Sequence, residues 1–251
     1  MDPFELLSVI SGEYQRILGK NLCGIYVHGS LAFGCFSRDR SDIDFLVAVY
    51  KELTQGQKES LILTLLRLNQ TAPPKGFEMS VVLFHDCQYF HYPTSFQLHY
   101  SNAHIKKTEE NLSEYCRTMN GTDFDLAAHF TVVKKAGIVL FGKPIEEVFG
   151  EVPGNAYLAS IKLDVEDAER DMISNPVYIT LNLCRVLAYL KTGLVLSKGE
   201  GGKWAVACLS DEYAGFVRKA LDCYLTDREY IADGNMGQKF ARYMKKIIFT
   251  N

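Results

Sequence analysis

Residues 43–49 read I-D-F-L-V-A-V, a nearly continuous apolar run with β-branched members that predicts a buried strand. Asp42 and Asp44 stand two residues apart at its start. Because side chains alternate across a strand, both carboxylates are expected on one face, while Ile43 and Phe45 point into the core. Two neighbouring carboxylates repel each other unless a cation neutralises them, and hard oxygen ligands suit Mg²⁺. The start of this strand is therefore predicted to bind metal through Asp42 and Asp44.

A tight turn is predicted upstream of this strand. Residues 23–27 form a short apolar run, typical of a strand, that leads into His28-Gly29-Ser30. Glycine allows close approach of the backbone, and a serine hydroxyl with neighbouring N–H groups can hold phosphate oxygens. We therefore expect Gly29 and Ser30 to contact phosphate.

A third carboxylate, Glu78, lies in the apolar run 77–84, which predicts another strand. A glutamate within an apolar strand is costly unless it has a partner. If this strand pairs beside residues 43–49, Glu78 comes close to both aspartates. There it can bind metal or take a proton from an acceptor hydroxyl.

Each of these motifs has an ordinary explanation when it is taken alone. A Gly-Ser pair is commonly a turn, an Asp-x-Asp pair is commonly solvated or capping, and a lone glutamate commonly faces water. Their combination is more specific: strand, Gly-Ser, ten residues, Ser-Asp-Ile-Asp, strand, and a glutamate in a later strand. Metal-assisted phosphoryl transfer requires these parts together.

The two halves of the chain differ in their hydrophobic patterns. Helical spacing over 4–18 and 53–69, and a short helix over 31–36, alternate with the strands and predict an α/β layer. The later segments are helical apart from a short apolar piece at 138–141: 125–136, 157–173, 177–192, 204–209, 211–224 and 235–248. The predicted fold class is α+β, with an α/β domain of mixed sheet at 1–150 and an all-helical domain at 151–251. Gly and Pro residues in 146–155 place the boundary.

Composition narrows the class of partner. The chain has 251 residues, of which 47% are hydrophobic, enough for two domains with buried cores. Its net charge is −3, and its lysine clusters are short pairs, so nucleic acid is not expected as a partner. Seven irregularly spaced cysteines without a C-x-x-C pair favour a reducing compartment. With neither a signal peptide nor a membrane-length apolar run, a cytoplasmic protein is expected. We also expect a monomer.

The motifs resemble a known family. Gly29-Ser30 and Ser41-Asp42-Ile43-Asp44 are similar to the signature of the polymerase-β-like nucleotidyltransferase superfamily. Further segments resemble the streptomycin/spectinomycin adenylyltransferases: Asp125-Leu126, Leu140-Phe141-Gly142, 177–193 with Leu181 and Arg185, and Ser197-Lys198 through Lys203-Trp204-Ala205. The resemblance implies transfer of AMP from ATP to a hydroxyl of a small acceptor, an aminoglycoside or aminocyclitol. It also implies that a helical domain follows the nucleotidyltransferase domain.

The resemblance also implies roles for individual residues. Asp42 and Asp44 would hold Mg²⁺, two ions being expected, and Glu78 would be the catalytic base and a further metal ligand. Ser30 and Ser41 would contact the phosphates of ATP. From the helical domain, Lys198 in the glycine-rich loop 197–202 would reach the triphosphate, and Tyr224 would lie near the base.

Departures from the family pattern concern the acceptor. Ala103 stands where aminoglycoside-modifying members carry a tryptophan, and a second tryptophan would fall near Glu166. Of two acids before a helix, one is kept as Asp171 and the other is Asn175. A cationic drug is bound by carboxylates and by the flat faces of aromatic rings, and this site has lost some of each. The sequence therefore predicts the reaction more firmly than the acceptor.

Two alternatives remain open at this stage. AMP transfer to another metabolite or to a protein side chain would use the same reaction centre. Small nucleotidyltransferase-fold proteins also act as antitoxins that work by binding, although the long helical half argues against this. Pyrophosphate release that depends on a candidate drug would distinguish the enzyme from the binding protein.

Overall fold

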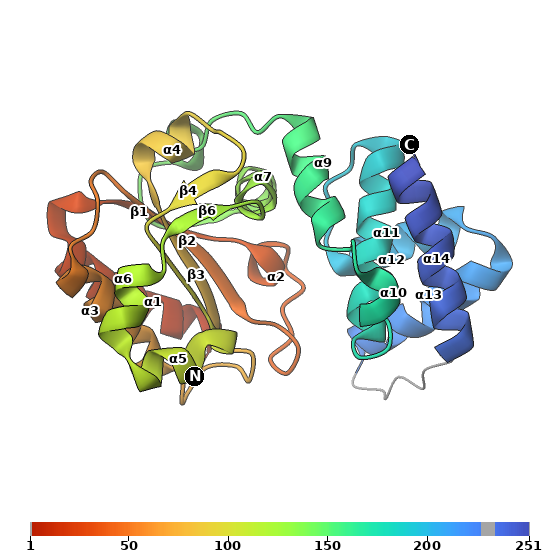
Figure 1. Cartoon of the computed structure of the whole chain (residues 1–251), viewed down its shortest axis with the longest axis horizontal. Coiled ribbons are helices and arrows are strands. Elements are labelled where there is room, and N and C mark those ends of the chain that lie inside the picture. Colours follow the sequence, from red (N-terminus) through yellow and green to blue (C-terminus); the bar gives the residue numbers. More distant parts are fainter. Residues whose placement is uncertain (1, 227–233, 251) are drawn as a thin grey trace. The chain divides into compact units, whose positions relative to one another are not determined.

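The computed structural model describes residues 2–226 and 234–250 and divides the chain into two compact units, Met1–Val152 and Pro153–Asn251 (Figure 1). We expect each unit to fold as a domain of its own, as predicted for residues 1–150 and 151–251. Within the described residues, no helix is both long enough and apolar enough to cross a membrane.

A five-stranded mixed sheet with the strand order β5-β3-β2-β1-β7 forms the centre of the first unit. Strands β2 and β3 run parallel, and the other neighbours are antiparallel, so the predicted mixed sheet is confirmed. The strands are β1 (Leu22–Val27), β2 (Ile43–Val49), β3 (Phe77–Leu83), β5 (Leu98–Ser101) and β7 (Ile138–Gly142). A small ribbon of β4 (Thr94–Phe96) and β6 (Gly121–Asp123) was not predicted, because neither three-residue strand has an alternating apolar pattern.

Helices cover both faces of this sheet (Figure 1). The helices α1 (Pro3–Leu18) and α3 (Gln55–Leu68) pack on one face, and each begins with a reciprocal capping box, Asp2 with Glu5 and Thr54 with Gln57. On the other face lie α4 (Phe84–Gln88), α7 (Leu126–Ala136) and α8 (Ile145–Val148). The remaining helices of this unit are α2 (Gly29–Ala32), α5 (Ile105–Glu110) and α6 (Leu112–Thr118), with short 3-10 turns at Gly19–Asn21 and Asn102–His104. The short helix predicted over 31–36 thus begins two residues earlier, at Gly29.

The alternation along β2 decides where its acids lie. Ile43 and Phe45 are fully buried in the core beneath α1 and α3, as predicted. Leu46 and Ala48 belong to the opposite core, which α7 covers. Because Asp44 has the same parity as Leu46, its carboxylate lies on the α7 side of the sheet.

The described part of the second unit consists of helices alone, in agreement with the predicted all-helical half. These helices are α9 (Gly154–Leu163), α10 (Ala168–Asp171), α11 (Pro176–Thr192), α12 (Lys198–Cys208), α13 (Asp211–Leu225) and α14 (Gly234–Thr250). The single helix predicted over 157–173 is wrong, because the chain turns between α9 and α10. At that turn Asp164 accepts hydrogen bonds from Tyr178 (3.2 Å) and Asn182 (2.8 Å), which tie it to α11.

A second correction concerns the start of α12. The loop predicted over 197–202 is the beginning of a helix, since Ser197 and Glu200 form a capping box. The glycines serve close packing rather than loop flexibility: a Cβ atom on Gly201 would lie 2.7 Å from Arg185 Cγ, and one on Gly202 would lie 2.8 Å from Leu181 Cδ2.

Candidate active site

The register between β2 and β3 brings the three predicted carboxylates together. Asp44 and Glu78 are direct partners across these parallel strands. One carboxylate oxygen from each of Asp42, Asp44 and Glu78 lies within 4.8 Å of the other two. Such a set of close oxygen donors fits the coordination chemistry of Mg²⁺.

A glycine makes room for this cluster. Gly29 has a φ of +61°, and a Cβ atom there would collide with the carboxylate of Asp44. The neighbouring backbone is tied to the same strand, because the His28 N–H donates to the Asp44 carbonyl over 3.0 Å. Only glycine therefore suits both the conformation and the close approach.

The two serines expected to contact phosphate lie in different local settings. The hydroxyl of Ser30 is buried and finds no hydrogen-bond partner among residues 2–226 and 234–250. A buried hydroxyl of this kind costs free energy unless another group satisfies it, so it fits an additional oxygen-rich ligand. Ser41, in contrast, accepts a hydrogen bond from the Ser37 N–H over 3.2 Å and closes the loop that precedes Asp42.

A histidine that the sequence analysis did not identify lies beside Glu78. His129 of α7 is largely buried, and its Nε2 lies 3.1 Å from Asp125 Oδ2 and 3.8 Å from Glu78 Oε1. Its ring packs 4.6 Å from that of His28. The spacing of Asp125 and His129, four residues apart on a predicted helix, is the signal that could have revealed the pair.

Burial and charge act in opposite directions on these groups. Burial favours the neutral form of His129, but the carboxylates of Asp125 and Glu78 outweigh it and raise its pKa to about 10. Burial raises the pKa of Glu78; His129 opposes this shift, and Asp42 adds to it.

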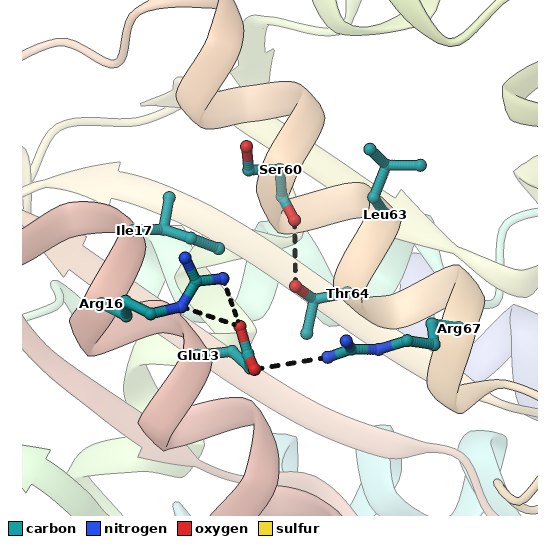
Figure 2. Close-up of a pocket in the computed structure, with 7 residues that line it drawn as sticks. All are labelled: Glu13, Arg16, Ile17, Ser60, Leu63, Thr64 and Arg67. Carbon is teal, nitrogen blue, oxygen red and sulfur yellow. Dashed lines mark hydrogen bonds and ion pairs between the residues drawn. The ribbon is translucent and has the colours of Figure 1, made fainter.

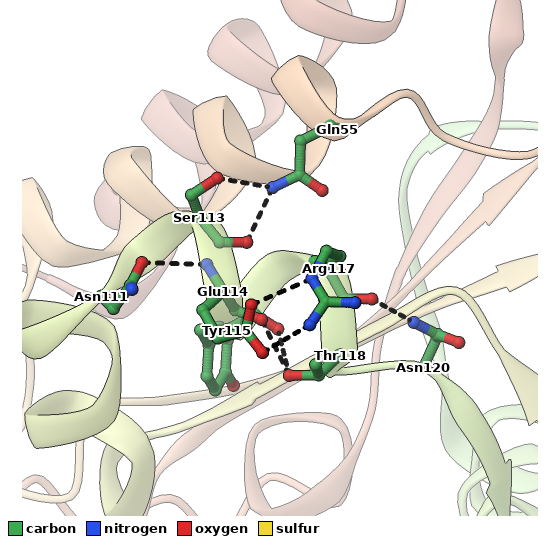
Figure 3. Close-up of polar contacts among 8 residues, drawn as sticks. All are labelled: Gln55, Asn111, Ser113, Glu114, Tyr115, Arg117, Thr118 and Asn120. Atoms are coloured by element: carbon green, nitrogen blue, oxygen red, sulfur yellow. Dashed lines mark hydrogen bonds and ion pairs between the residues drawn. The ribbon is translucent and has the colours of Figure 1, made fainter.

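The strand that flanks Glu78 is held by polar contacts from α6. Tyr115 donates a hydrogen bond of 2.7 Å to the carbonyl of His99 on β5. Figure 3 shows how α6 is fixed in turn, with Gln55 of α3 donating to the Ser113 carbonyl over 2.9 Å. Ser101 of β5 pairs with Glu78, and Ala103, which follows two residues later, is exposed.

The second unit brings its predicted residues together in two places. Lys198 is the first residue of α12, and its Nζ lies 4.5 Å from the ring centre of Tyr178. Tyr224 of α13 lies beside Gly199, one residue along the same helix. At the other place, Asp171 pairs with Arg170 over 2.8 Å and its carbonyl accepts the Asn175 N–H over 2.9 Å.

A pocket elsewhere in the first unit lies apart from the carboxylates. Figure 2 shows it between α1 and α3, where Glu13 pairs with Arg16 (2.6 Å) and Arg67 (3.5 Å). These charges satisfy one another on the face of the sheet opposite Asp44 and Glu78. The pocket therefore adds nothing to the candidate active site.

An α/β unit with a carboxylate cluster beside Gly29 and Ser30 at the start of α2, together with a helical unit, defines a nucleotidyltransferase-type protein. Residues 147–247 match the family model "Aminoglycoside adenylyltransferase, C-terminal domain". The helical part of the chain is therefore similar to the aminoglycoside adenylyltransferases, as its motifs predicted.

Similar proteins align with almost the whole chain. An aminoglycoside (3'') (9) adenylyltransferase of Klebsiella pneumoniae is 24% identical over 246 residues, covering 95% of this chain and 92% of the relative. A spectinomycin 9-adenylyltransferase of Campylobacter jejuni is 23% identical, covering 98% and 95%. The solved structure of the spectinomycin adenyltransferase AAD(9) from Enterococcus, with ATP and spectinomycin, has a TM-score of 0.83 at 20% identity, covering 98% and 99%. This last likeness confirms the predicted fold.

Proposed function

We propose that the chain transfers AMP from ATP to a hydroxyl of a small cationic acceptor of the aminoglycoside or aminocyclitol class. The observation that supports this most directly is the pairing of Asp44 with Glu78 across β2 and β3, with Asp42 within 4.8 Å of both. Relatives that match the chain over nearly its full length are named for adenylyl transfer to aminoglycosides or spectinomycin.

Asp42 and Asp44 are the proposed ligands of Mg²⁺, and Glu78 is a further candidate ligand. When bound, the metal would neutralise charge on the triphosphate and orient it for in-line attack. The space left by Gly29 beside Asp44 and the unsatisfied hydroxyl of Ser30 support a phosphate position at this turn.

Glu78 is the proposed general base. A sugar-type hydroxyl is a poor nucleophile until its proton is removed, and the base must lie within hydrogen-bond reach of it. Asp42 and Asp44 are committed to metal, which leaves Glu78 to accept the proton. The pairing of Glu78 with Asp44 across β2 and β3 supports this role, because it places the carboxylate beside the proposed metal position.

The second unit is proposed to supply nucleotide and acceptor contacts. Lys198 at the start of α12 carries an ammonium suited to the triphosphate, and Tyr224 beside the same helix offers a ring for the nucleotide base. Asp171 and Asn175, which a backbone hydrogen bond joins, are proposed to bind the acceptor, as is Ala103 of the first unit.

A mass-spectrometric screen of acceptors with ATP and Mg²⁺ tests this function. We expect an AMP adduct on a cationic sugar-type acceptor, together with acceptor-dependent release of pyrophosphate. An adduct on an unrelated metabolite or on a protein would support the alternative acceptors instead. A tight stoichiometric complex with a partner protein, without any adduct, would support a binding function.

Two variants test the carboxylates in the same assay. Asp42→Asn or Asp44→Asn removes one metal carboxylate and is expected to lower turnover by about 10²-fold or more while leaving the fold intact. Asp86→Asn on α4, beyond the opposite end of β3, is the matched control and should keep the wild-type rate. Wild-type turnover by either Asp42→Asn or Asp44→Asn would refute the metal assignment.

A further inference from the structure

Glu78, His129 and Asp125 lie close together in the first unit, and an aromatic pair includes Phe124, the residue before Asp125. His129 lies between Glu78 and Asp125, with Nε2 3.8 Å and 3.1 Å from their carboxylate oxygens. Burial and then the Asp125 charge raise the pKa of the Tyr92 phenol. The ring of Tyr92 meets that of Phe124 edge to face, with centroids 5.5 Å apart.

Phe124 is unusual among these residues because its large apolar side chain is 49% exposed. A single exposed phenylalanine is ordinary at a protein surface. Phe124, however, has an aromatic neighbour and stands between two carboxylates, those of Asp123 and Asp125. The Asp125 N–H donates to Asp123 Oδ1 over 2.9 Å, which fixes this short segment between β6 and α7.

Carboxylates flank Phe124 on both sides in the chain, those of Asp123 and Asp125. One ligand atom from each of Asp125, His129 and Glu78 lies within 4.8 Å of the other two, so acidic groups outnumber the one histidine of this cluster. An ammonium or guanidinium group is attracted both by such carboxylates and by the face of an aromatic ring. A neutral polyol would gain neither interaction, and an anion would be repelled.

We propose that Tyr92 and Phe124, with Asp123 and Asp125, form a subsite for a cationic group of the acceptor, next to the base Glu78. The inference rests on the proposed function and specifies where the acceptor's charge binds. It makes Phe124 a specificity-determining residue: its ring selects cationic acceptors over neutral ones and takes no part in the proton transfer.

The test compares Phe124→Leu with the wild-type enzyme, using spectinomycin as the cationic probe. Leucine keeps an apolar side chain but removes the aromatic face. We expect the KM for spectinomycin to rise roughly 3- to 30-fold, the range of a single cation–π contact, while the KM for ATP stays unchanged. Phe124→Tyr, which restores a ring, should return the KM to within about 3-fold of wild type.

A matched control is Phe4→Leu on α1, which removes a ring of similar exposure, 47%, and should leave both KM values unchanged. If the wild type adenylylates spectinomycin and Phe124→Leu does so with an unchanged KM, the subsite is refuted while the proposed function stands. If the wild type modifies no cationic acceptor, the proposed function fails and the subsite fails with it. Equal rises in the KM for ATP and for spectinomycin would also overturn the subsite, because they would indicate a general disturbance.

Discussion

The carboxylate cluster of the first unit and the start of α12 in the second unit carry predicted reaction residues in different ways. Asp44 and Glu78 are paired by strand register, so the backbone itself sets their separation. Lys198 projects from the first residue of a helix, and its ammonium lies over the ring of Tyr178 at the end of a flexible side chain. Groups fixed by the backbone suit the reacting atoms, whereas a flexible cation suits a ligand that must enter and leave.

The two regions also differ in how closely the surrounding residues fit around the reaction residues. Gly29 fits against Asp44 so closely that a larger residue would displace the carboxylate. At α12 the close packing concerns the helix backbone, because Gly201 and Gly202 allow it to approach α11. This packing does not involve the Lys198 side chain. Substitutions should therefore affect chemistry most severely in the first region and nucleotide binding in the second.

The largest effect is expected from Glu78→Gln. Glutamine keeps the size and hydrogen bonding of glutamate but cannot accept the proton, so turnover should fall by about 10²–10⁴-fold. Calorimetry should show ATP and acceptor binding with little change, and a steady-state assay gives the rate. This separation of binding from chemistry would sharpen the contrast between the two regions.

Two other results for Glu78→Gln would change the assignment. Normal turnover would make Glu78 structural and place the base elsewhere. Loss of Mg·ATP binding in parallel with the rate would make Glu78 primarily a metal ligand. Glu146→Gln in α8 offers a control on an acid without a proposed role, and it should keep the wild-type rate.

Local sequence patterns explain which parts of each region could be predicted and which could not. The β2 and β3 strands, and the meeting of Asp44 with Glu78, were predictable because apolar runs and parity determine which side chains share a face. Strands β4 and β6 were missed because three residues of mixed polarity carry no periodic signal. His129 was missed because a polar residue on an amphipathic helix commonly faces water, and its burial depends on the distant strand that carries Glu78.

The start of α12 was misassigned for a local reason. Its glycines suggested a loop, although Ser197 and Glu200 have the spacing of a capping box. Glycine is a poor helix former, and its use here depends on the contact with α11, which no local pattern contains.

A smaller effect than that of Glu78→Gln is expected from Lys198→Ala. A charge-assisted hydrogen bond to phosphate contributes about 1.5–3 kcal/mol, so kcat/KM for ATP should fall by roughly 10- to 150-fold, with a smaller change in acceptor binding. Lys203→Ala, an exposed lysine on the same helix, is the control for loss of a positive charge. Unchanged ATP affinity and turnover in Lys198→Ala would reduce this lysine to a solvated surface residue.

The smallest effect is expected from Ser197→Ala, which asks whether the helix start matters to Lys198. The Ser197 side chain accepts the Glu200 N–H over 3.2 Å, and loss of such a cap costs about 0.5–2 kcal/mol. Chemical denaturation should register this loss in the free energy of unfolding, and the KM for ATP should rise less than in Lys198→Ala. The matched control is Ser210→Ala: Ser210 is the N-cap residue of α13 but makes no side-chain capping bond there, so its removal should leave the free energy of unfolding almost unchanged. Equal destabilisation by the two substitutions would show that the capping box does not hold the start of α12. A KM for ATP as high in Ser197→Ala as in Lys198→Ala would show that the lysine depends on its helix as strictly as Asp44 depends on its strand, and the contrast between the two regions would disappear.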